Sequence, residues 1–232
     1  MIITDEILGE IRLVSNSRAR RIIVRKKDGY LQLTHPSSVS LSYIHKTIEE
    51  MRPRLQQLLN KSDNSHLFTP QTEFHTSTFK LNIIENALTT NCYTSLKDGV
   101  LSISFPVGTD FRHGEVQQFI RKSIEKALRY EASRILPDKV KKLAEKYGFT
   151  YSTLKINKSR GRWGSCSSRK SINLSLYCML LPEYLIDFVI LHELCHTIEM
   201  NHGEHFWDIL DKVAEGKSKQ YTQELKHFKI VI

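Results

Sequence analysis

The chain has 232 residues, of which 40% are hydrophobic and 25% charged, and its formal net charge at pH 7 is +9. This composition is that of a globular protein and excludes a disordered one. The four cysteines are scattered and include no C-x-x-C pair, which argues against a disulfide scaffold or a cysteine zinc site. No apolar run reaches the roughly 20 residues that cross a bilayer, and no signal peptide is evident, so we expect a cytoplasmic protein without a membrane partner.

We expect residues 1–106 to form a mainly β N-terminal unit with one helix. Runs of β-branched and alternating apolar residues predict six short strands, at 11–14, 21–25, 30–34, 79–84, 91–94 and 100–105. Asp28-Gly29 is a hairpin signal between the second and third of them. Apolar residues at helical spacing predict a helix from Ser40 or Ser42 to about Leu59, and Pro53 is expected to kink or break it.

The pattern changes near residue 107, where we place the start of a second domain, residues 107–232. A helix is predicted from about Asp110 to Leu136, followed by a second helix that begins at Pro137 and ends before Gly148. Three strands are predicted next, at 151–156, 162–167 and 171–176. The sequence shows no internal repeat.

The following segment is a helix that is apolar nearly all round and carries an H-E-x-x-H motif at residues 192–196. His192 and His196 lie one helical turn apart on one face, so both imidazoles can reach a single metal ion. An unpaired buried carboxylate destabilises a folded protein by several kcal/mol, so Glu193 needs a partner here. A divalent cation, with a water for Glu193 to hold, satisfies all three groups.

A third metal ligand is sought just after the motif. His202 follows His196 by six positions, at a turn, and would leave a fourth coordination position for water. Its alternative role is that of a helix-end histidine stabilised by the negative end of the helix dipole. Glu199 competes but would reach the metal poorly from the same straight helix. His205 also competes but falls in the first turn of the next helix, where it would support a ligand or contact substrate instead. We interpret Cys166 and Cys195 as packing residues.

A Gly three positions after the second His is typical of metzincins, and Glu199 at that position argues against that family. Several other segments accompany the motif at 192–196: Met200-Asn201-His202-Gly203, Phe206-Trp207, the 162–166 segment Arg-Trp-Gly-Ser-Cys and the arginine-rich first strands. Taken together, they resemble the YgjP-like family of metal-dependent hydrolases. That family looks related to the SprT and Spartan metalloproteases.

The resemblance implies an α+β fold with a zincin-like catalytic domain, in which the active-site helix lies against a small antiparallel sheet. It implies that His192, His196 and His202 bind one Zn²⁺ and that Glu193 is the general base. We therefore expect a zinc metallopeptidase in which Glu193 activates a zinc-bound water to cleave the peptide bonds of a peptide or protein substrate.

Zincin-like folds can pair an extended substrate with an edge strand. The candidate substrate contacts are Arg162, Trp163, Gly164, Ser165 and His205, with core packing as the alternative role for Trp163. Two other functions stay open, a nucleic-acid-associated protein with a structural zinc and a zinc amidohydrolase acting on a non-peptide substrate. The net charge and five basic residues without an acidic one between 158 and 170 leave nucleic acid as a possible partner.

Overall fold

A computed structural model describes residues 1–27, 30–60 and 67–232, so the predicted turn at Asp28-Gly29 lies outside the described residues. Contacts divide the chain into two units, Met1–Ser65 and His66–Ile232. The division expected near residue 107 differs from this one because strands after residue 79 share their core with the long helix that follows them. Each unit is described by itself.

The first unit is a four-stranded sheet with one helix. Its elements are β1 (Ile2–Asp5), β2 (Gly9–Ser15), β3 (Ile23–Lys27), β4 (Tyr30–His35) and α1 (Leu41–Asn60). The strand order is β1-β2-β4-β3, in which only β2 and β4 pair in parallel. Leu31 and Leu33 of β4 pack with Ile44 and Ile48 of α1 in a core of this unit's own. Helix α1 continues through Pro53, so of the predicted kink or break, the break is wrong and the kink stays a prediction.

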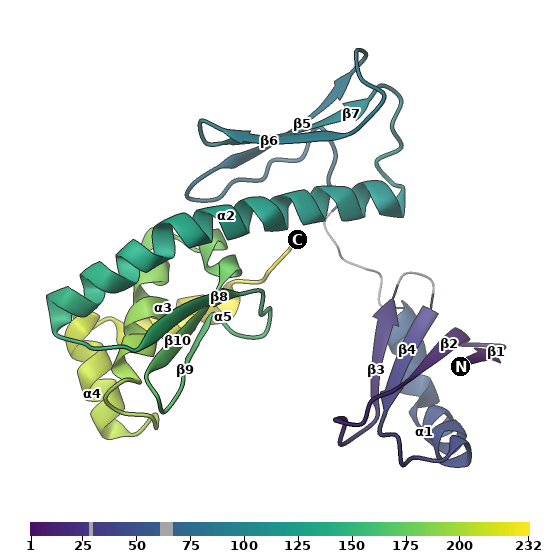
Figure 1. The fold of residues 1–232 in the computed structure, drawn as a ribbon, viewed down its shortest axis with the longest axis horizontal. Coiled ribbons are helices and arrows are strands. Elements are labelled where there is room, and N and C mark those ends of the chain that lie inside the picture. The colour runs from purple at the N-terminus through teal and green to yellow at the C-terminus, as the bar shows by residue number, and fades with distance from the viewer. Residues whose placement is uncertain (28–29, 61–66) are drawn as a thin grey trace. The chain divides into compact units, whose positions relative to one another are not determined.

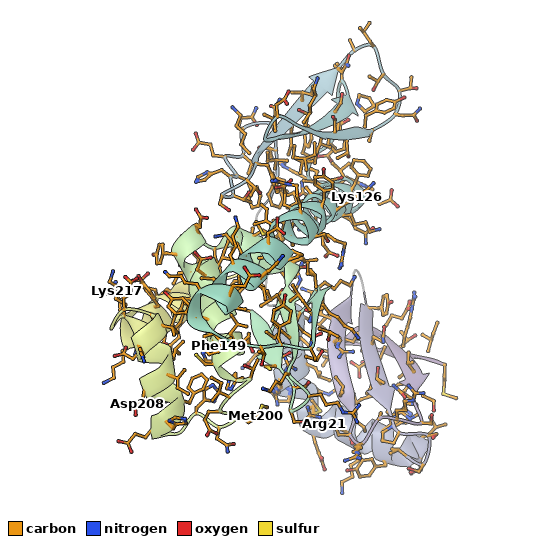
Figure 2. The ribbon with its side chains drawn as sticks, turned by 60° about the vertical axis from the view of Figure 1, so that its left-hand side comes forward. Arg21, Lys126, Phe149, Met200, Asp208 and Lys217 are labelled. Atoms are coloured by element: carbon orange, nitrogen blue, oxygen red, sulfur yellow. The ribbon has the colours of Figure 1, made fainter. Side chains whose placement is uncertain are left out.

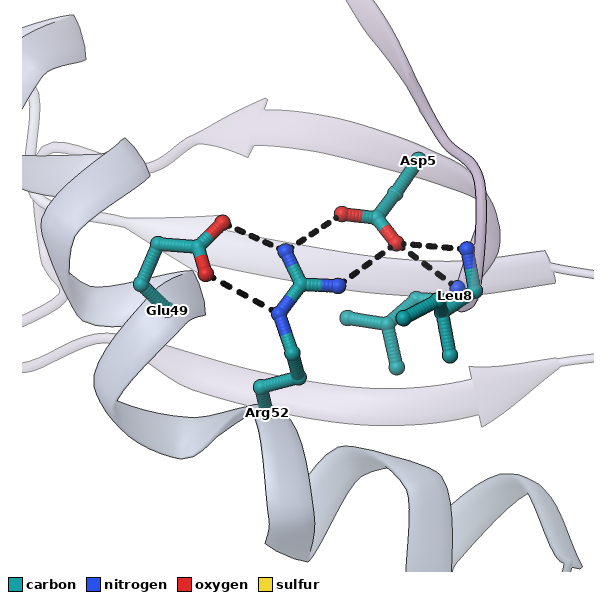
Figure 3. Close-up of polar contacts among 5 residues, drawn as sticks. Asp5, Leu8, Glu49 and Arg52 are labelled. Carbon is teal, nitrogen blue, oxygen red and sulfur yellow. Dashed lines mark hydrogen bonds and ion pairs between the residues drawn. The ribbon is translucent and has the colours of Figure 1, made fainter.

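An ion pair fastens the β1–β2 turn to α1 (Figure 3). Arg52 donates from Nη1 and Nη2 to the two carboxylate oxygens of Asp5, and both hydrogen bonds are 2.9 Å long. Arg52 also forms an ion pair with Glu49. Asp5 Oδ1 accepts from the backbone N–H groups of Leu8 and Ile7 as well. These hydrogen bonds lower the pKa of Asp5 from 3.8 to about 2, and those from Arg52 contribute most, followed by the one from Leu8.

Replacing Asp5 with asparagine is expected to destabilise the first unit by about 1–2 kcal/mol at neutral pH, because the charged partner of Arg52 is lost. Since the pKa is lowered in the fold, this stabilisation is present above pH 3.8 and disappears as the pH falls through about 2. Amide hydrogen exchange of β2 and β4 measures it. Glu50→Gln, at an exposed pair with Lys46, is the control and should change little.

The second unit contains two three-stranded sheets and most of the helices. Its elements are β5 (Lys80–Asn86), β6 (Tyr93–Lys97), β7 (Val100–Pro106), α2 (Gly114–Tyr147), β8 (Thr153–Asn157), β9 (Gly164–Cys166), β10 (Ser171–Ser175), the 3₁₀ helix η1 (Leu176–Leu180), α3 (Glu183–Cys195), α4 (Glu204–Val213) and α5 (Ser218–His227). In Figure 1, α2 runs between the β5–β7 sheet and the half that holds α3.

Helix α2 is continuous over 34 residues, so the predicted division at Pro137 is wrong. The apolar side chains on both sides of Pro137, Leu136 and Val140, are fully buried, and this packing outweighs the one backbone hydrogen bond that proline cannot donate. The predicted end of the helix is confirmed. Gly148 has φ 73°, in the left-handed region, and its N–H bonds to the carbonyl of Ala144.

One strand arrangement occurs three times along the chain. In each case the first and third strands pair in parallel, the second pairs antiparallel with the third at an edge, and a helix follows. The three sets are β2–β4 with α1, β5–β7 with α2, and β8–β10 with α3. The sequence showed no repeat because topology fixes only where apolar and turn residues fall, and many side chains satisfy that pattern.

The mixed α+β architecture is confirmed, with α3 packed against β9 and β10. The expectation that this sheet is antiparallel is wrong in part. β9 pairs antiparallel with β10, but β8 pairs with β10 in parallel, because β9 and its loops carry the chain across between them. Among the described residues, no helix is long and apolar enough to cross a membrane.

Candidate metal centre

Helix α3 carries the H-E-x-x-H motif into the core of the second unit. Pro182 begins it, with its carbonyl accepting from the N–H groups of Leu185 and Ile186. Apolar side chains on all sides of the helix are buried, which explains its nearly uniform hydrophobicity. Lys139 of α2 holds its first turn through Glu183, at 2.7 Å, and Asp187, at 2.8 Å.

Three imidazoles converge at the end of α3, as the motif predicted. The Nε2 atom of His192 lies 3.2 Å from Nε2 of His196 and 3.1 Å from Nε2 of His202. Tetrahedral zinc with Zn–N bonds of about 2.0–2.1 Å separates its nitrogen ligands by roughly 3.3 Å. The two distances from His192 are therefore close to those that one such ion requires, and all three ligand atoms lie within 4.8 Å of one another, forming the metal-capable cluster found among the described residues.

The loop between α3 and α4 brings His202 back to the helix, where its Nε2 atom meets that of His192. Met200 of this loop is labelled in Figure 2. Glu199 contributes to this loop and not to the cluster. Its carbonyl accepts from His196 Nδ1 at 3.0 Å, and its carboxylate accepts from the N–H of Asn201. Because Nδ1 of His196 carries the proton, its Nε2 keeps a lone pair for a metal.

The pKa of His192 is lowered to about 3, mainly because its imidazole is buried. Electrostatic repulsion from His196 and His202 lowers it further. Burial also lowers the pKa of His196. Both imidazoles are therefore neutral at physiological pH, which is the form that binds a metal ion.

Phe206 orients the cluster from α4, a role that the sequence did not predict. Its ring is fully buried and stacks on His196 with a centroid distance of 4.5 Å. It also meets the rings of His192 and His202 edge to face, at 5.0 Å and 4.7 Å. One aromatic side chain thus restricts all three imidazoles, and only its place in the Phe206-Trp207 motif pointed to it.

Glu193 follows the first histidine of the cluster on α3, and its side chain lies against Gly164 of β9. Its Oε2 atom is buried without a hydrogen-bond partner in the structure. Burial raises the pKa of Glu193 to about 8, opposed by the positive charge of Arg162. A Cβ atom on Gly164 would lie 2.5 Å from Glu193 Oε1 and 2.6 Å from its Cγ, so glycine makes the room for this side chain.

The general-base role expected for Glu193 predicts that Gly164→Ala, which would displace this side chain, slows substrate cleavage by about a hundredfold. Metal content should not change, because no histidine of the cluster is touched. Turnover and bound metal per chain are the two measurements. Gly161→Ala is the control, since a Cβ there meets nothing. Full activity in Gly164→Ala would contradict the role given to this contact.

The other predicted substrate residues lie around β9. Strand β9 is an edge strand, and it includes Gly164 and Ser165. Trp163 is partly buried and packs against the core, and its carbonyl accepts from the N–H of Ser175 at 2.7 Å, while its contact with substrate stays a prediction. Arg162 is exposed. His205 is exposed in the first turn of α4 and lies outside the histidine cluster.

The two cysteines interpreted as packing residues also lie outside the cluster. Cys195 is fully buried, and burial raises the pKa of its thiol to about 12. Cys166 is half-buried, with a raised thiol pKa whose main cause is also burial.

Two of the basic residues between 158 and 170 have partners within the chain. Lys158 lies 3.7 Å from a carboxylate oxygen of Glu125. Arg160 donates to the carbonyl of Ile232 at 2.7 Å and lies over the ring of Tyr177. This segment therefore fastens the chain end to the sheet and offers fewer free charges than its sequence indicated.

Three converging imidazoles are the donor set that a metal-dependent hydrolase with an H-E-x-x-H motif requires, and here a buried glutamate follows the first of them. A family model described as YgjP-like, metallopeptidase domain, matches residues 20–228. The chain therefore belongs to the YgjP-like metallopeptidase family, and the resemblance seen in its motifs is confirmed.

Two solved structures are similar to part of the chain. The metallopeptidase zymogen of Pyrococcus abyssi abylysin covers 42% of this chain and 100% of its own, with 19% identity and a TM-score of 0.37. The metallopeptidase zymogen of Methanocaldococcus jannaschii jannalysin covers 39% of this chain and 92% of its own, with 23% identity and a TM-score of 0.35. A search of curated proteins finds no match.

Proposed function

We propose that the protein is a zinc-dependent peptidase that cleaves peptide bonds with the help of Glu193. One Zn²⁺ would be held by the Nε2 atoms of His192, His196 and His202. The observation that carries the proposal is the partnerless, buried Oε2 of Glu193 next to this histidine cluster. A buried carboxylate without a partner destabilises the fold, so its presence here indicates a catalytic function. A structural zinc site does not require such a group.

When bound, the metal ion would polarise the scissile carbonyl and acidify water. The remaining steps belong to the chain. Glu193 accepts a proton from the attacking water at Oε2 and passes it to the leaving amine nitrogen. The absence of a side chain at Gly164 makes room for the carboxylate of Glu193, and the ring of Phe206 restricts the imidazoles.

The substrate would lie extended along the free edge of β9. The N–H of Ser175 bonds to the carbonyl of Trp163, and the N–H of Ser167 bonds to the carbonyl of Ser171, so these positions face β10. Because bonded and non-bonded pairs alternate in an antiparallel ladder, Gly164 and Cys166 direct their backbone groups to the open edge. A substrate strand can pair there. Ser165, Arg162 and His205 are proposed as further substrate contacts.

The test is cleavage of an unstructured protein before and after metal removal. The protein is stripped with a chelator, assayed, and then reloaded with one equivalent of Zn²⁺. Fragments identified by mass spectrometry should be absent from the stripped sample and return on reloading. Equal cleavage by both samples, or release of ammonia from non-peptide amides without peptide cleavage, would contradict the proposal.

A further inference from the structure

The first unit has an open groove between edge strand β3 and helix α1, which we call the β3–α1 groove. It consists of two adjoining depressions of about 760 and 580 Å³ that share Arg21 and Ile22. The helix contributes residues that recur every three or four positions and so form one stripe. That stripe is Tyr43, Thr47, Met51, Arg54 and Leu58.

The floor of the groove is apolar. Ile22 and Val24 pack against the core of the first unit from the strand side, and Met51 and Leu58 do so from the helix. The Nζ atom of Lys26 donates to the carbonyl of Leu59 at 2.9 Å and so connects β3 with the last turn of α1. The groove thus follows the strand from the start of α1 to its last turn.

The wall of the groove is a free strand edge. β3 is the last strand of its sheet and pairs only with β4 among the described strands. In an antiparallel ladder the residues of an edge strand alternate, so every second residue of β3 directs its N–H and C=O away from β4 and towards the open edge.

The rim of the groove is positively charged. Arg20, Arg21 and Arg54 are exposed, and no carboxylate of the described part of the first unit lies within ion-pair distance of them. Among the described residues, no acidic one lines the groove, and of the carboxylates on α1, Glu49 pairs with Arg52 and Glu50 with Lys46. An incoming acidic group would therefore meet unneutralised guanidinium groups.

We propose that the β3–α1 groove binds an extended acidic peptide segment, which adds to β3 as a further strand. Its backbone pairs with the outward backbone groups of β3, its apolar side chains enter the floor between Ile22 and Met51, and its carboxylates meet the three arginines. A single-stranded nucleic acid fits less well, because Tyr43 is the one aromatic ring among the lining residues and stacking needs several. This docking needs no metal and stands apart from the proposed cleavage.

The probe is a fluorescein-labelled peptide of alternating glutamate and valine, and binding is followed by anisotropy. The full chain is used as Glu193→Gln, so that the probe is not cleaved. Arg21→Glu combined with Arg54→Glu should weaken binding by at least about tenfold. Lys126→Glu combined with Arg129→Glu, on the exposed side of α2, makes the same change in net charge and should have no such effect.

Strand addition is tested by methylating alternate backbone nitrogens of the probe in two phases. One phase places methyl groups against β3 and should abolish binding, whereas the other places them toward solvent and should be tolerated. Equal binding of both phases would overturn strand addition. The proposal also fails if the acidic probe does not bind, if the charge reversals on the two units weaken it equally, or if an oligonucleotide binds the groove in its place.

Discussion

Replacing Glu193 with glutamine is expected to reduce peptide cleavage by about a hundred- to ten-thousand-fold while the protein still binds its metal. Glutamine has nearly the same shape as glutamate, so it can keep the place beside Gly164, but it cannot accept the proton from the attacking water. The measurements are turnover of an unstructured protein substrate and metal content per chain. Loss of metal together with activity would mean that Glu193 supports the fold and is not the base.

The same substitution should also change how the stability of the metal-free protein depends on pH. Because burial raises the pKa of Glu193 from 4.5 to about 8, the folded chain keeps a proton that the unfolded chain releases in this range. Stability of the metal-free protein therefore falls as the pH rises through that window. Glu193→Gln removes this fall. Thermal unfolding of both proteins from about pH 5 to about pH 9 gives a readout that is independent of activity.

The second large effect is expected at the histidine cluster. Three or four ligands share a zinc binding free energy of about 10–16 kcal/mol, so His196→Ala should weaken metal binding by at least about a hundredfold. Cleavage should disappear at low metal concentrations. His205→Ala is the matched control, because His205 is exposed in α4 outside the cluster. It should retain the metal.

Competition with a chromophoric chelator measures both affinities. Removal of His202 separates the proposed ligand set from its alternatives. If His202→Ala bound zinc as tightly as the unaltered chain, then His202 would be a helix-end residue and another group would complete the site.

The part of the site that the sequence predicted is the part that depends on local spacing. His192 and His196 meet because four positions along a helix is one turn, and His202 follows because the turn after α3 is short. Gly164 and Phe206 could be placed near the motif but not in their roles. Those roles depend on how β9 and α4 pack against α3, and residue spacing along one helix contains no such information.

The organisation of the chain was harder to predict for the same reason. Pro137 indicated a helix boundary, but buried neighbours on both sides keep α2 intact. The strands between 80 and 106 resemble the first unit in composition, yet they pack on α2, which moves the division of the chain to residue 65. Tertiary packing decided both cases against local preference.

The most direct measurement is a crystal structure of the zinc-loaded protein with anomalous diffraction at the zinc absorption edge. The proposed site predicts one anomalous peak, at about 2.0–2.1 Å from the Nε2 atoms of His192, His196 and His202, with Glu193 near it but not bound. A peak ligated by Glu199 or by a cysteine, or a site in which Glu193 itself coordinates the ion, would contradict the arrangement proposed for this peptidase.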